Sequence, residues 1–225
     1  MTGDWTHAVE RRATAWHEAG HAVAATALGL AVRYVTLRSR NGGGQTTYRE
    51  TLPPAWGWRA AGAVHLAGMA GEQLLHTDRA VLIHGGYYDL RNARLVARAA
   101  IDVRDHPADD SGRPRRLADA KTGGWAEWLD AAKAMDPAWS ERDVGALMWR
   151  HAVDTVTEHL DAVAWVAGLL LTSPRAVPGR QVREVFAASE RSSEPPAVDD
   201  VEWWIPRHTR MQWRRTSVCS AEVAA

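Results

Sequence analysis

The pentapeptide His17-Glu18-Ala19-Gly20-His21 constrains this chain more than any other feature of its sequence. It lies in an alanine-rich segment without proline that is followed by Gly29, so residues from about 6 to 28 are predicted to form one helix. Residues four positions apart share one face of a helix, and the two imidazoles therefore point toward one place. Two histidines at this spacing can bind one zinc ion, and Glu18, which follows about 100° around the helix, can act as a base on water.

The alternative is a helix whose histidines are only packed or exposed. Cys219 is the only cysteine, so neither an intramolecular disulfide nor a thiolate zinc cluster can form, and any ligands must be histidines and carboxylates. A catalytic zinc site needs a third protein ligand. The residues that could supply it are His65, Glu72, His76, His84 and Asp89. Asp89 follows a Gly-Gly pair and is expected to head a helix, near its positive end.

The remaining sequence predicts a mainly α, α+β fold with one small sheet. Residues 32–39 and 45–51 alternate and are rich in β-branched side chains, and the glycine-rich turn at 41–44 joins them into a hairpin. Further helices are predicted over residues 56–76, 88–104, from about 124, 141–171 and 179–189. The charged, proline-bearing stretch 104–116 is predicted to be a surface loop.

Several motifs, taken in order, resemble the peptidase domain of the FtsH-type, membrane-anchored AAA proteases. That family's zinc helix carries H-E-x-G-H-A, which residues 17–22 match. "VRYVTLRSRNGGG" resembles the strand and glycine turn that follow, and "AGMAGEQL" (67–74) resembles the helix motif G-G-R-A-A-E-E-L. "HGGYYDLRNARLVAR" (84–98) resembles the helix that opens with the third zinc ligand. The C-terminal helices also match in order and style, so the resemblance covers residues from about 10 to 186.

This resemblance implies a helical zincin-like metallopeptidase domain that holds one Zn²⁺ per chain through His17, His21 and Asp89, with Glu18 as the catalytic base. Glu72 is interpreted as a residue that orients a ligand histidine, or as an alternative ligand. Tyr87 and Tyr88 could contact the substrate or donate a hydrogen bond to an oxyanion; packing against the zinc helix is the competing interpretation. The sequence departs from the family at Met69, where the family has arginine, and at Tyr88, where it has asparagine.

Other features bound the function. The 27 basic and 27 acidic side chains cancel, so no specific nucleic-acid binding is predicted. The charged N-terminus does not look like a signal peptide, and the longest apolar run (162–171) is too short to span a bilayer, so a cytoplasmic protein is expected. No G-x-x-x-x-G-K-[ST] motif is present. We therefore expect ATP-independent hydrolysis of unfolded or flexible polypeptides, with an ATPase acting in trans and homo-oligomer formation left as open alternatives.

The chain is expected to consist of a peptidase-like domain at 1–188, followed by a linker and tail at 189–225. The tail interleaves tryptophans with arginines: Trp203, Trp204 and Trp213 with Arg207, Arg210, Arg214 and Arg215. Such a segment could dock on a partner protein, a membrane surface or single-stranded nucleic acid, or fold back onto the domain. It motivates a second hypothesis, in which the chain is a catalytically weak or inactive metallopeptidase-like module that binds or regulates through its tail.

Overall fold

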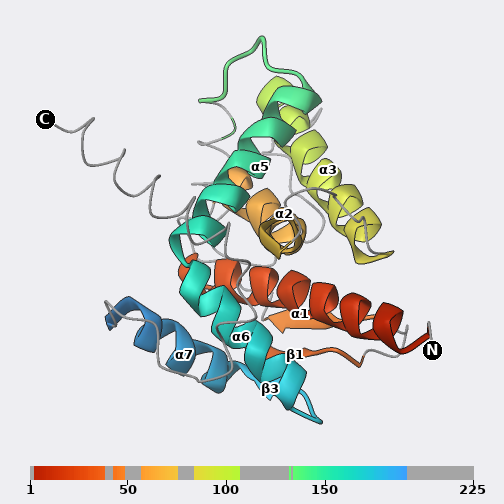
Figure 1. Cartoon of the computed structure of the whole chain (residues 1–225). Coiled ribbons are helices and arrows are strands. Elements are labelled where there is room, and N and C mark those ends of the chain that lie inside the picture. Colours follow the sequence, from red (N-terminus) through yellow and green to blue (C-terminus); the bar gives the residue numbers. More distant parts are fainter. Residues whose placement is uncertain are drawn as a thin grey trace, which may run out of the picture.

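The computed structural model describes residues 3–38, 43–48, 57–75, 84–106, 132 and 134–191. This part of the chain is mainly helical, with one small antiparallel sheet, which confirms the predicted class (Figure 1). The helices are α1 (Gly3–Ala27), α2 (Trp58–Leu75), α3 (His84–Asp105), α5 (Glu141–Glu158), α6 (Leu160–Thr172) and α7 (Gly179–Arg191). The strands are β1 (Val32–Thr36), β2 (Gln45–Tyr48) and β3 (Val177–Pro178). Among the helices described, none combines the length and the apolar character needed to cross a membrane.

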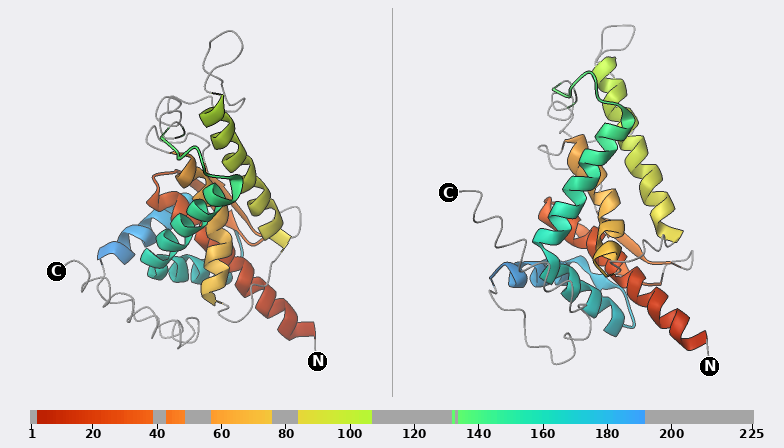
Figure 2. Two further views of the ribbon diagram at one scale, coloured as in Figure 1. Left: turned by 90° about the horizontal axis from the view of Figure 1, so that it is seen from above. Right: turned by 45° about the horizontal axis from the view of Figure 1, so that its top comes forward.

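Helix α1 is the central element of the fold. It packs against α2 and α6, and the small sheet lies beside it (Figures 1 and 2). Its buried face includes Trp16, which is fully buried. The helix ends in a Schellman motif: Gly29 has a φ of 84°, the Leu30 N–H donates to the Ala25 carbonyl, and the Gly29 N–H donates to that of Thr26. The predicted helix and its glycine stop are thereby confirmed.

Small residues let α2 approach α1 closely. A Cβ atom at Gly71 would lie 2.5 Å from the Trp16 carbonyl oxygen, and one at Gly20 would overlap the Ala67 carbonyl. Neither position can carry a larger residue unless the backbones separate. The two helices therefore meet backbone to backbone, which brings one face of α2 directly beneath the histidines of α1.

The sheet has the strand order β2-β1-β3. The predicted hairpin is confirmed, because β1 and β2 pair antiparallel with Val35 opposite Thr46. Both strands are shorter than predicted, and residues 39–42 and 49–51 lie outside the described part of the chain. Strand β3, which pairs with β1 through Tyr34 and Pro178, was not predicted because two residues give no periodic signal. Its proline is tolerated because β3 lies at a sheet edge.

Two helix predictions need correction. The single helix expected over 141–171 is divided at His159 (φ −109°, ψ 33°), so that α5 packs on α2 and α3 while α6 packs on α1 and α7. Local periodicity cannot reveal this division, because the segments on both sides are helical. Helix α3 begins at His84 and not near 88, because Gly85 and Gly86 form part of its first turn. The helix expected from 124 lies largely outside the described residues, and so do residues 107–116 and the tail from 192.

Candidate metal centre

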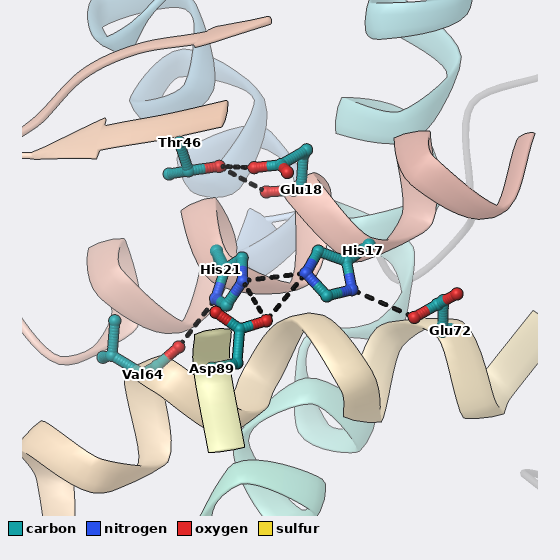
Figure 3. A network of polar contacts seen from close by, with 7 residues as sticks. All are labelled: His17, Glu18, His21, Thr46, Val64, Glu72 and Asp89. Atoms are coloured by element: carbon teal, nitrogen blue, oxygen red, sulfur yellow. Dashed lines mark hydrogen bonds and ion pairs between the residues drawn. The ribbon is translucent and has the colours of Figure 1, made fainter. Parts of the chain in front are cut away.

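Three ligand-type atoms from α1 and α3 meet in a small triangle (Figure 3). The Nε2 atoms of His17 and His21 are 3.1 Å apart, and Oδ2 of Asp89 lies 2.9 Å from the first and 3.2 Å from the second. Around a tetrahedral zinc ion with bonds of about 2.0–2.2 Å, ligand atoms are separated by roughly 3.3 Å. The triangle therefore has the dimensions of three ligand atoms around one ion.

The hydrogen bonds made by the Nδ1 atoms of both histidines determine the tautomer of each ring, and hence the state of its Nε2 atom. Nδ1 of His21 lies 2.8 Å from the Val64 carbonyl oxygen, which can only accept, so Nδ1 carries the proton. Nδ1 of His17 likewise lies 3.0 Å from Oε2 of Glu72 and donates to it. When the rings are neutral, both therefore aim an Nε2 lone pair at the oxygen of Asp89. Three lone pairs at this distance repel one another unless a cation, either a metal ion or a proton, lies among them.

The electrostatics agree with a cation site. Burial is the largest influence on the pKa of His17 and lowers it, but hydrogen bonds to Asp89 and Glu72 prevail and raise that pKa to about 10. The pKa of His21 is also raised, because Asp89 outweighs burial. Burial raises the pKa of Asp89, but the two histidines outweigh it, so the pKa is lowered. The carboxylates thus favour positive charge on the two imidazoles, and a divalent ion can supply that charge in place of protons.

Helix α2 supplies the surroundings of the triangle at three positions spaced by four residues. Val64 and Glu72 accept from His21 and His17, and Gly68 lies between them. A Cβ atom at Gly68 would lie 2.6 Å from Nε2 of His17 and even closer to Nε2 of His21. The absence of a side chain there leaves room beside both nitrogens. Val64 and Gly68 are parts of the site that were not predicted from the sequence, although their spacing from Glu72 could have indicated them.

Glu18 lies outside the triangle. It is 6% exposed, and its Oε2 accepts a 2.7 Å hydrogen bond from Oγ1 of Thr46 in β2. In Figure 3 the carboxylate and the ligand histidines project from different sides of α1. A Cβ at Gly44 would lie 2.5 Å from Oε1 of Glu18, so the residue just before β2 lies directly against this side chain. Burial raises the pKa of Glu18. Thr46 was not predicted from the sequence to be the partner of Glu18.

Of the third-ligand candidates that the structure describes, Asp89 is the one brought to the two histidines. It is the sixth residue of α3 and does not head the helix as expected, so the helix dipole, which is strongest within the first turn, contributes less than predicted. His65 lies on α2 outside the triangle, and burial, with a smaller contribution from His21, lowers its pKa to about 4. His76 and the side chain of His84 lie outside the described part.

The tyrosine pair lies at the start of α3, next to Asp89. Tyr87 and Tyr88 are 69% and 64% exposed, and their rings meet edge to face with centroids 5.8 Å apart. This exposure contradicts the interpretation that they pack against the zinc helix. Instead, they present an aromatic surface to solvent beside the ligand triangle.

Comparison with known proteins does not identify the chain. No protein-family model matches it, and a comparison with curated proteins also finds no match. The chemistry of the site therefore has to be judged from its donor atoms. Two neutral imidazoles and one carboxylate suit zinc and other divalent transition ions, and the buried group of His17, His21 and Asp89 could hold such an ion.

Proposed function

We propose that this protein is a zinc-dependent metalloendopeptidase. The observation that carries the proposal is the ligand triangle, in which the two histidines of an H-E-x-x-H helix meet a carboxylate from a distant helix. His17, His21 and Asp89 would hold the ion, and Glu72 and Val64 would keep both imidazoles in the tautomer that binds metal. A zinc ion at this site would polarise a carbonyl group and lower the pKa of coordinated water toward neutrality.

Glu18 is the proposed general base. It would accept a proton from the attacking water and pass it to the leaving amine. Because the side chain is held by Thr46, the carboxylate must turn away from β2 to reach the ligand triangle. The raised pKa of Glu18 favours this role, since a base works best when its pKa lies nearer the working pH.

Unfolded or flexible polypeptides are the proposed substrates. Strand β2 lies at one edge of the sheet, next to Glu18, so an extended peptide could add to its outer edge as a further strand. The exposed rings of Tyr87 and Tyr88 would then contact substrate side chains near the scissile bond. We also propose that the fold is of the FtsH peptidase, zincin-like type; the ordered motifs described above support this relationship.

A second candidate function has one observation in its favour. The Glu18 carboxylate is occupied by Thr46, and among the described residues no hydrogen bond joins it to the ligand triangle. A site of this kind suits an ion that stabilises the fold without hydrolysing a bond. The protein would then be a metal-stabilised binding or regulatory module.

One experiment separates the two functions. Purified protein should contain about one zinc per chain by mass spectrometry and should cleave fluorescently labelled casein. Glu18→Gln should retain the metal and lose activity by at least about 100-fold, whereas Glu158→Gln, at an exposed position on α5, should change neither. Zinc bound by a wild-type protein that cleaves no peptide in a broad library would favour the regulatory module. Protein that binds no divalent ion would refute both functions.

A further inference from the structure

A second charged feature lies at the end of α6, apart from the ligand triangle. A hollow of about 320 Å³ is formed by α1, the end of β1 and the loop that joins α6 to β3. We call it the arginine hollow; its lining consists of Arg11, Thr36, Leu37, Arg38, Ser173, Pro174 and Arg175. The lining residues include three arginines and two residues with hydroxyl groups, but no aspartate or glutamate.

The charges of the arginine hollow are not compensated within the described part of the chain. No ion pair joins Arg11, Arg38 or Arg175 to an acidic residue there, whereas Arg94 and Arg98 both pair with Glu141. A hollow between α3 and α5 contains its own acidic groups, including Asp102 and Glu141, beside its arginines. The arginine hollow is therefore a local positive region in a chain whose formal net charge is zero.

Hydrogen bonds hold the lining in place. Nη2 of Arg11 donates to the Leu171 carbonyl over 3.0 Å, which fixes the guanidinium and leaves most of its N–H donors free for another acceptor. The hydroxyl of Ser173 accepts from the backbone N–H of Arg175 and donates to its carbonyl, and the hydroxyl of Thr36 accepts from the N–H of Arg38. Both backbone segments that carry the other two guanidiniums are thus fixed locally.

We propose that the arginine hollow binds a phosphoryl oxyanion that carries at least two negative charges. Planar guanidinium groups match the oxygens of phosphate in bidentate geometry, and charge-assisted hydrogen bonds of this kind are roughly twice as strong as neutral ones. A single carboxylate would neutralise only one of the three arginines. The phosphoryl group could belong to a small molecule or to a phosphorylated peptide chain, since both present the same oxygens to the hollow.

Amide chemical shifts of the full chain provide the test. Sodium pyrophosphate, titrated at constant ionic strength, should bind saturably and shift the backbone amide signals of residues 36–38, Ser173 and Arg175. Arg11→Gln and Arg175→Gln should each weaken binding at least about tenfold, the loss expected for one charge-assisted hydrogen bond. Arg150→Gln and Arg180→Gln are matched controls, because both arginines are exposed and pair with an acid one turn away. These controls should change the affinity by less than about twofold.

Three results would overturn the assignment: no saturation by about 10 mM, equal losses in the control variants, or shifts centred on His17 and Asp89. A phosphoserine peptide and its unphosphorylated counterpart distinguish the two sources. Tighter binding of the phosphopeptide than of pyrophosphate would assign a phosphorylated chain, and the reverse would assign a small anion. None of these measurements depends on peptide cleavage, so the result is independent of the proposed function.

Discussion

Replacing Gly68 by alanine should strongly weaken metal binding while leaving all three ligands in the sequence. Gly68 lies on α2 between the two residues that accept from His17 and His21. The added methyl carbon would lie 2.6 Å from Nε2 of His17 and closer still to Nε2 of His21, beside the two atoms that an ion must touch. The substitution therefore tests whether the triangle is a metal site and not merely a hydrogen-bonded cluster.

The size of the effect follows from these distances. Ordinary contact of a Cβ atom begins near 3.4 Å, so the His17 ring would have to move by about 0.8 Å, the difference between 3.4 and 2.6 Å. Zinc–ligand distances vary by only about 0.2 Å, and such a shift removes at least one imidazole from coordination. Disturbing a residue that merely orients a ligand already costs about 10- to 100-fold in affinity. We expect Gly68→Ala to lower zinc affinity by at least about 100-fold.

The assay is competition for zinc with a chromophoric chelator, with circular dichroism to show that the variant is folded. Gly145→Ala and Gly168→Ala serve as controls, because a Cβ at either helical glycine meets no atom within 4 Å. Both controls should bind zinc normally and gain about 0.5–1 kcal/mol of stability. If Gly68→Ala bound zinc as tightly as the wild type, the inferred position of the ion beside both Nε2 atoms would be wrong.

Three further outcomes are expected. Glu72→Ala should lower zinc affinity by about 10- to 100-fold, measured by the same competition, because His17 loses the acceptor of its Nδ1 proton; an unchanged affinity would show that Glu72 does not orient the ring. The metal-free protein, prepared with a chelator, gains stability from protonated His17, whose pKa is raised to about 10. This contribution to stability is complete below the unfolded pKa near 6.5 and is lost as the pH rises toward 10. The free energy of unfolding should therefore fall from pH 6 to 10, a trend that His17→Gln should weaken, while zinc affinity should rise with pH. Thr46→Val should destabilise the protein by about 1–3 kcal/mol in urea denaturation, because the buried Glu18 carboxylate loses its donor, and Thr46→Ser should not.

The parts of the structure that the sequence predicts are those encoded in local periodicity. Helix α1 is predicted from its alanine content, and its end is predicted from Gly29, which has a positive φ in the structure. The pairing of β1 with β2 follows from alternation on both sides of a glycine-rich turn. The division at His159 and the strand at Val177–Pro178 arise from packing between distant segments, so no local pattern reports them.

The candidate site divides in the same way. The spacing of His17 and His21 places them on one face of the helix, independently of the rest of the fold. The spacing of residues alone does not indicate which carboxylate meets them; the resemblance to a known family is the main indication of Asp89. The hydrogen-bond partners of the imidazoles depend on the distance between α1 and α2. Gly20 and Gly71 permit a close approach of the two helices, but they do not determine which residues meet.

The position of Glu18 connects the sheet to the proposed chemistry. Its carboxylate and the edge strand β2 are joined by a short hydrogen bond, and Gly44 of the same hairpin leaves no space for a side chain against it. A peptide that added to the outer edge of β2 would therefore bind directly beside the residue proposed as the base. If binding there shifted β2 slightly, Thr46 would release Glu18 toward the ligand triangle. A wild-type protein with zinc bound and a peptide on β2, but with the Thr46 bond intact, would support the regulatory module instead.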